Sequence, residues 1–230
     1  MPTAAAGTDT GRRYHANFDV AHLGADPLLA VVADGMGDGP GSAMAGRTAV
    51  DLVVSHVAAS GVAGFRPALA EAHRAVSDFG RSSGTLAGCT LTALAESPDG
   101  LWLCQLGDSR AYRLRSGLLE LLTVDHTMAW LGAVHGWWPH DSAQAHAARY
   151  QLTRYVGHPS HPDPDLLHIR PQAGDVYLLC TDGVAEQVPY HRILDILRTS
   201  TPEQAVSALL ADSEAAGGND NATAIVVRLP

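Results

Sequence analysis

Between residues 89 and 124 the chain alternates short apolar runs with turn residues. Four runs lie in this region, separated by Pro98-Asp99-Gly100, Gly107-Asp108-Ser109 and Ser116-Gly117. Neighbouring parallel strands need a crossover of a dozen or more residues, whereas antiparallel strands need only a short turn. We therefore interpret the region as an antiparallel meander, and a parallel doubly wound sheet is disfavoured.

The remaining pattern predicts alternating strands and helix pairs. Strands are expected at 14–20, 28–33, 175–181 and 222–229, and a polar turn at 22–27. Helices are expected at 42–59, at 67–79, near 190–198 and at 202–214. Without any linker, this order predicts one α+β layered domain over residues 1–230. Residues 127–172 are irregular and look like an insertion, and long loops in compact domains are often functional.

Net charge, hydropathy and cysteine positions indicate which partners and which cellular compartment to expect. The formal net charge is -9, which argues against nucleic acid and anionic membrane surfaces as main partners but suits a cation-holding site. No run approaches the ~18 apolar residues of a membrane span, and residues 1–13 lack the apolar core of a signal peptide. Cys89, Cys104 and Cys180 lie in apolar runs without metal or redox spacing. We expect buried free thiols, a cytoplasmic protein and a monomer. The absence of lysine suggests a high-GC, bacterial coding sequence.

Five aspartates stand where predicted strands end or turn. One of them, Asp34, ends the run 28–33 and is followed by glycines at 35, 37, 39, 41 and 46; the others are Asp19, Asp108, Asp182 and Asp220. Each alone is explained by the bonds that aspartate makes to turn backbone. As a set they match the oxygen ligands that Mg²⁺ and Mn²⁺ prefer, and a glycine beside an acid lets a carbonyl oxygen approach as well.

Several segments resemble the metal-dependent serine/threonine protein phosphatases of type 2C, in their compact bacterial form. The resemblance covers nearly the whole chain, in family order. The matching segments are VVADGMGDGPGS (31–42), GCTLTAL (88–94), LCQLGDSRAYRLR (103–115), LLTVDHT (121–127), DVYLLCTDGV (175–184) and NDNATAIVV (219–227). It implies a four-layer αββα sandwich, two antiparallel sheets flanked by helix pairs, with metals at one end.

The resemblance also assigns roles to the acids. Asp34 would bridge two Mn²⁺ or Mg²⁺ ions, and the Gly35 carbonyl would bind one of them. Asp182 and Asp220 would hold one ion of the pair. The others have lesser roles: Asp19 would support the site, and Asp108 matches a position linked to a third, weaker metal. The insertion 127–172 matches the family's flap beside the substrate groove.

The implied reaction is hydrolysis of phosphoserine or phosphothreonine in proteins by a water that two metal ions activate. Such enzymes typically oppose a serine/threonine kinase. Two alternatives stay open from the sequence. One is a degenerate phosphatase fold that binds a phosphoprotein or signalling partner without turnover, and the other is hydrolysis of a small phosphoester.

Two departures from the family pattern affect the site. Phe18 stands where the family has a glutamate or glutamine that helps hold a metal through water. Tyr14 stands where the family has the arginine that clamps phosphate. Arg13 is one residue away and could take that role through a one-residue bulge, or it could be a solvated surface arginine. Asp38 and Ser42 replace a glycine and a glutamate; Asp38 could be an outer-shell acid or a turn residue.

The histidines and tryptophans of the insertion leave further alternatives. A zinc site at His158, His161 and His168 is disfavoured because these residues lack compact ligand spacing. His126 is expected to support the base of the flap rather than to donate protons. Trp137 and Trp138 could contact a substrate or simply pack the flap.

Overall fold

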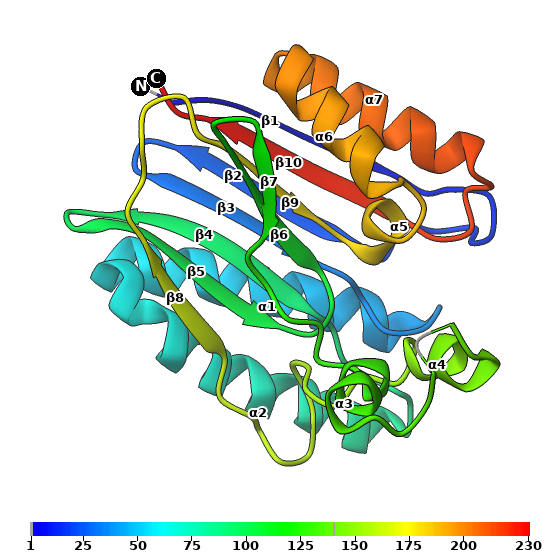
Figure 1. Ribbon diagram of the computed structural model, residues 1–230. Coiled ribbons are helices and arrows are strands. Elements are labelled where there is room, and N and C mark those ends of the chain that lie inside the picture. The colour runs from blue at the N-terminus through cyan, green and yellow to red at the C-terminus, as the bar shows by residue number, and fades with distance from the viewer. Residues whose placement is uncertain (1, 140) are drawn as a thin grey trace.

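The computed structural model describes residues 2–139 and 141–230. Two five-stranded antiparallel sheets pack face to face, and helices cover both outer faces (Figure 1). The predicted αββα sandwich is confirmed, and neighbouring strands in both sheets are antiparallel.

The first sheet has the order β1-β10-β9-β6-β7. Its strands are β1 (Thr3–Asp9), β10 (Ala222–Arg228), β9 (Val176–Cys180), β6 (Arg110–Arg115) and β7 (Leu118–Leu121). Its outer face carries α5 (Asp182–Ala185), α6 (Tyr190–Thr199) and α7 (Pro202–Ala215) (Figure 1). The helix α7 begins with a capping box, in which Thr201 and Gln204 bond to each other's backbone N–H groups.

The second sheet has the order β2-β3-β4-β5-β8. Its strands are β2 (Val20–Ala25), β3 (Leu28–Ala33), β4 (Leu91–Ser97), β5 (Gly100–Leu106) and β8 (Asp165–Ile169). The long helices α1 (Pro40–Ser60) and α2 (Phe65–Ser83) cover it, joined by a single 3-10 turn, η1 (Gly61–Gly64).

The strand β3 shows why the central runs are continuously apolar. All six of its residues are buried. Leu28, Ala30 and Val32 face the other sheet, whereas the alternate residues Leu29 and Val31 face α1 and α2. Since successive side chains point to opposite faces, a strand covered on both sides has no polar position. The end of β3 is therefore firmly fixed.

The N-terminal strands differ from the prediction. No strand covers residues 14–19; β2 begins at Val20 and includes part of the predicted polar turn. Asp19 thus precedes a strand rather than ending one. The strand β1, which the sequence pattern did not indicate, pairs along its whole length with β10, from Thr3 opposite Arg228 to Asp9 opposite Ala222. Its small, half-exposed residues carry little local pattern.

The predicted meander is divided between the two sheets. The strands β4 and β5 pair in the second sheet, whereas β6 pairs with β7 and β9 in the first. The turn Gly107-Asp108-Ser109 therefore crosses from one sheet to the other at the end of the sandwich, instead of closing a hairpin.

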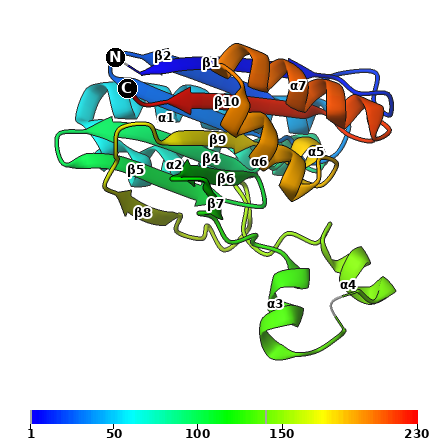
Figure 2. The ribbon, with the colours of Figure 1, turned by 45° about the horizontal axis from the view of Figure 1, so that its top comes forward.

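The insertion contains ordered elements. Helices α3 (Met128–His135) and α4 (Ala143–Ala148) stand away from the sandwich as a separate lobe (Figure 2). The return segment forms β8, which pairs with β5 at the sheet edge. We call the lobe with its connecting residues, 127–157, the flap.

The stretch Pro40–Ser83 is, by length and composition alone, apolar enough to cross a membrane, with a window of mean hydropathy 1.4. The expectation that no segment reaches this threshold is therefore too strict. In the structure the stretch is three helical elements, and residues such as Ala45, Ala49 and Val53 are buried in the core beneath them. Core helices pass the same test, so the finding is weak evidence for a span.

Candidate active site

Asp34 is held at the buried end of β3 by two hydrogen bonds to one residue. Its backbone N–H donates to Thr90 Oγ1 at 3.0 Å, and its carbonyl accepts from Thr90 N–H at 2.9 Å. The next residue must be glycine, because a Cβ on Gly35 would lie 2.7 Å from the Ser42 carbonyl oxygen and 2.9 Å from that of Phe18. The tight packing fixes where the Asp34 carboxylate points.

Asp182 and Asp220 are brought together by the neighbouring strands β9 and β10. Asp182 is the first residue of α5, directly after β9, and Asp220 precedes β10. A Cβ on Gly183 would lie only 2.0 Å from the Asn221 carbonyl oxygen, so this glycine allows the two segments to touch. The Asp220 carboxylate accepts from the Asn221 N–H at 2.8 Å.

Asp19 and Asp108 reach the same end from other segments. Asp19 is 9% exposed, and Thr181 Oγ1 donates to its Oδ2 at 2.8 Å. Asp108 lies in the turn that crosses between the sheets, where Gly107 has a φ of 103°. The predicted metal residues thus come from both sheets.

The acids surround one cavity of about 260 Å³. Asp34, Gly35, Asp108, Asp182 and Asp220 all line it, and Asp19 lies behind it. The other lining residues are Tyr14, Met36, Gly37, Leu86, Thr90, Tyr150, Leu152 and Asn221. We call this space the acidic cavity.

Burial raises the pKa of every carboxyl group in this set, and repulsion between neighbouring carboxylates adds to the shift in all but Asp220. Burial raises the pKa of Asp19 and of Asp182 to about 7, and nearby aspartates add to both shifts. Burial and the charge of Asp182 raise the pKa of Asp34 and of Asp108 well above the usual range. Burial also raises that of Asp220. Uncompensated carboxylates this close need positive charge to remain ionised at neutral pH.

The donor set fits divalent cations. Asp19 Oδ1 and Asp182 Oδ1 are buried and have no hydrogen-bond partner among the described residues, which is costly unless another ligand binds them. The donors are carboxylate and carbonyl oxygens, which hard cations such as Mg²⁺ and Mn²⁺ prefer. Within residues 2–139 and 141–230, no three His, Cys, Asp or Glu side chains already converge at the spacing of a metal site. The acids therefore line the walls of the cavity without meeting at one point.

Tyr14, not Arg13, lines the acidic cavity. Arg13 is exposed, and its guanidinium carbon lies 5.0 Å from the centre of the Tyr14 ring. Its charge lowers the pKa of Asp220, so it is close enough to act electrostatically. Phe18 is buried with its ring edge-on to Tyr14, at 6.3 Å between centroids. The role of Arg13 as a phosphate clamp stays a prediction.

Asp38 and Ser42, which also depart from the family pattern, lie outside the acidic cavity. Asp38 is exposed and does not line the acidic cavity. Ser42 is buried, and its hydroxyl donates to the Met36 carbonyl, which closes the glycine-rich loop after β3.

Sequence analysis missed the residues that frame the cavity. Asn221 accepts from Phe18 N–H at 2.8 Å and donates to the carbonyls of Thr10 and Ala16, so it holds the segment that carries Tyr14. Leu86 and Tyr150, 61% and 74% exposed, form an apolar rim. Only the position of Asn221 beside Asp220 could have indicated its role.

His126 supports the base of the flap, as predicted. Its Nδ1 accepts from Gly107 N–H at 3.0 Å, and its Nε2 lies 3.1 Å from Asp165 Oδ2 and 2.9 Å from a terminal nitrogen of Arg154. Burial lowers its pKa, which keeps the ring neutral. The ring thereby ties the Asp108 turn to the segment that returns from the flap.

The three histidines of the proline-rich loop have separate partners. His161 stacks on His73 at 5.3 Å, His158 bonds Ser160, and His168 bonds the Asp99 carbonyl. They do not converge. His158 and His161 lie in the loop, whereas the structure places His168 on β8, contrary to the predicted loop. The three cysteines are free and buried, as expected.

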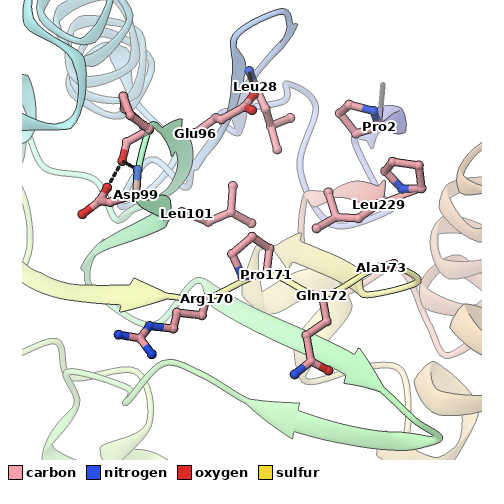
Figure 3. A pocket seen from close by; sticks show the side chains of 14 residues that line it. Pro2, Leu28, Glu96, Asp99, Leu101, Arg170, Pro171, Gln172, Ala173 and Leu229 are labelled. Atoms are coloured by element: carbon pink, nitrogen blue, oxygen red, sulfur yellow. Dashed lines mark hydrogen bonds between the residues drawn. The ribbon is translucent and has the colours of Figure 1, made fainter.

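A larger cavity, of about 640 Å³, lies at the opposite end of the sandwich. Leu28, Leu101, Pro171 and Leu229 face its middle, whereas Asp99 lies at its edge (Figure 3). Its charged groups do not converge, and it contains none of the predicted site residues. The candidate site is therefore the smaller acidic cavity.

The family model for protein phosphatase 2C matches residues 14–213. The serine/threonine protein phosphatase PstP of Mycobacterium tuberculosis is 34% identical over 140 residues. That match covers 60% of this chain but only 27% of PstP.

Solved structures agree in fold. The PPM Ser-Thr phosphatase MsPP from Mycobacterium smegmatis, in complex with cacodylate, has a TM-score of 0.88 at 33% identity, covering 99% of this chain and 98% of that one. The catalytic domain of PstP, in complex with two manganese ions, has a TM-score of 0.85 at 28% identity, covering 100% and 99%. The chain therefore belongs to the protein phosphatase 2C family of metal-dependent serine/threonine phosphatases.

Proposed function

We propose that this chain hydrolyses phosphoserine and phosphothreonine in proteins, using two Mn²⁺ or Mg²⁺ ions. The main support for this proposal is the acidic cavity. Carboxylates from both sheets surround one space there, and two buried carboxylate oxygens have no hydrogen-bond partner within the described residues. Family membership and the manganese-bound relative support the proposal.

The position of each acid in the cavity suggests which ion it would hold. Asp34, Asp182 and Asp220, with the Gly35 carbonyl, would hold the two ions; Asp19 would support them from behind, and Asp108 would hold a third. Ions bound there would supply Lewis acidity and lower the pKa of water, so that a hydroxide-like nucleophile is available at neutral pH.

The rest of the cavity would bind and orient the substrate. Burial and the nearby aspartates raise the pKa of Tyr14, so its hydroxyl remains protonated and can donate to a phosphoryl oxygen. No cysteine serves as nucleophile, because burial raises the pKa of all three thiols, that of Cys180 to about 12. We also propose an opposing serine/threonine kinase, a cytoplasmic location and a monomeric state.

The second candidate is a phosphoprotein-binding module without turnover. Tyr14 favours it, because among the described residues no arginine lines the acidic cavity to hold phosphate. The complete set of five acids favours the enzyme, because binding a phosphate without hydrolysis does not require five carboxylates around one space.

The test is hydrolysis of p-nitrophenyl phosphate with Mn²⁺, with Mg²⁺ and with EDTA. We expect activity that needs a metal and that falls about a hundredfold or more in Asp34→Asn, because a neutral amide is a much poorer ligand for a hard cation. Asp38→Asn is the matched control, since Asp38 lies in the same loop but outside the cavity, and it should keep its activity.

Full activity in EDTA or in Asp34→Asn would contradict the two-metal mechanism. A folded protein that binds Mn²⁺ and a phosphopeptide but releases no phosphate would establish the binding module instead.

A further inference from the structure

A second cavity, of about 340 Å³, adjoins the acidic cavity. It lies between the flap helices α3 and α4 on one side and the end of α5 on the other, and we call it the flap pocket. Three segments line both cavities with residues close together in sequence: 108 and 110, 149 and 150, 182 and 186. A chain bound at the acidic cavity can therefore continue into the flap pocket.

On the core side of the flap pocket, the Arg110 side chain is held in place and its charge is paired. Arg110 donates from Nε and from one terminal nitrogen to the Asp125 carboxylate, at 2.9 and 2.6 Å. Its other terminal nitrogen donates to the Ala185 carbonyl at 3.3 Å. Because these bonds occupy the guanidinium on every side, Arg110 forms a fixed floor rather than a ligand-binding cation.

The flap side is an apolar wall. Trp130, Ala133 and Trp138 line it, with Ala145 from α4. Trp138 lies directly on α3, because Gly132 has no side chain; a Cβ there would lie 2.4 Å from two carbons of the Trp138 ring. The glycine thus lets the indole lie flat against the helix, so the wall is formed before any ligand binds.

Two charged side chains in the flap pocket remain available. The side chains of Arg149 and Glu186 make no hydrogen bond with the described residues and no ion pair within 4.0 Å; only their backbone N–H groups are bonded, within their own helical turns. A guanidinium donates to carbonyl oxygens and a carboxylate accepts from N–H groups. The two can therefore bond to the main chain of an extended polypeptide while its side chain meets the indoles.

We propose that the flap pocket is a specificity subsite that receives an apolar side chain from the substrate segment next to the phosphorylated residue. The inference rests on the proposed phosphatase function and adds to it a preference in sequence. The volume of the flap pocket lies in the range of protein ligand pockets. Its wall residue Trp130 is 47% exposed, so the pocket is open to a ligand.

The test uses phosphothreonine peptides on a neutral, small-residue background, with leucine or glycine placed at each flanking position in turn. We expect one position at which leucine raises kcat/KM about tenfold over glycine, the lower range for an apolar group filling a pocket. In Trp138→Ala that ratio should fall to near one. Gly132→Ala, which displaces the Trp138 ring, should lower it in the same way.

Trp137→Ala is the matched control. Trp137 adjoins Trp138, at 5.7 Å between ring centroids, but is 49% exposed and does not line the flap pocket. It should keep the leucine preference. A variant that merely misfolds would lose activity on leucine and glycine peptides alike, so the ratio separates recognition from loss of fold.

Two outcomes would overturn the proposal: no flanking position that prefers leucine, or a preference that survives in Trp138→Ala. Hydrolysis of p-nitrophenyl phosphate by the native protein separates these from failure of the function itself. If that small ester is hydrolysed and no leucine preference is found, only the subsite is wrong.

Discussion

Tyr14 is the residue that most distinguishes this acidic cavity. Its ring stands between the exposed Arg13 and the buried Phe18, and its hydroxyl end lies among the aspartates. A phenol can donate one hydrogen bond to a phosphate, whereas an arginine can donate two charge-assisted hydrogen bonds in a bidentate arrangement. The native cavity should therefore hold phosphate weakly and release it readily.

We expect Tyr14→Arg to bind inorganic phosphate about tenfold more tightly, since hydrogen bonds from a charged group are worth roughly 1.5–3 kcal/mol. The measurement is competitive inhibition of p-nitrophenyl phosphate hydrolysis in saturating Mn²⁺. Tyr150→Arg, on the rim of the same cavity, is the comparison and should have a smaller effect. An unchanged inhibition constant in Tyr14→Arg would show that phosphate does not reach this side chain.

That acids gather at one end of the sandwich could be predicted from sequence, because Asp34 and Asp182 follow apolar runs. Asp19 was expected at the end of a strand, whereas the structure places it before β2. The choice between Arg13 and Tyr14 could not be predicted. It depends on the path of residues 10–19, which form no regular strand and are held by the amide of Asn221, more than 200 residues away in the chain. No local pattern contains that contact.

At the scale of elements, the predictable parts were those buried on both faces. The central strands have continuous apolar runs and the long helices have periodic apolar positions, so the sequence of each segment alone predicts it. The edge strands β1 and β2 are only half-buried and lack a continuous apolar run. The strand β1 is defined only by its pairing with β10. The division of the meander also escaped prediction, because a turn of three residues looks the same whether it closes a hairpin or changes sheets.

One link between elements should depend on pH. His73 on α2 accepts from Gly157 N–H at Nδ1, 3.0 Å, and donates from Nε2 to the Pro162 carbonyl, 3.1 Å, which ties the helix to the segment following the flap. Burial lowers its pKa in the folded protein. The unfolded chain therefore takes up the proton first as the pH falls, and this contribution to stability is present above about pH 6.5 and lost below it.

We predict that His73→Leu is less stable than the native protein near neutral pH by roughly 1–3 kcal/mol, because two half-buried backbone groups lose their partner. It should also lose less stability on acidification. Urea unfolding in EDTA at about pH 7.5 and about pH 5.5 measures both effects. His191→Leu, at an exposed position on α6, is the control. An identical pH dependence in His73→Leu and the native protein would exclude His73 as its source.

At the scale of the whole molecule, the formal net charge of -9 is distributed over a chain without lysine. The field of such a molecule attracts basic polypeptides and repels acidic ones over about a Debye length. Substrates approach a site that itself contains several carboxylates, so this field acts mainly on the rate of encounter.

We therefore expect kcat/KM to respond to salt with opposite signs for two phosphopeptides. For a peptide flanked by arginines it should fall, and for one flanked by aspartates it should rise, between low salt and about 0.15 M. An inert salt such as sodium chloride, with Mn²⁺ held constant, is suitable for the titration. A parallel change for both peptides would point to an effect of salt on the metal or the fold instead.

The acidic cavity draws its walls from both sheets: Asp34 follows β3 of one, and Asp182 and Asp220 adjoin β9 and β10 of the other. Neither half of the sandwich contains a working set of ligands. During synthesis, the residues after 218 must emerge and β10 must insert before the cavity closes. With the proposed function, a nascent or partly folded chain would have no means of removing phosphate from its surroundings, and catalysis would begin only when the two halves have docked.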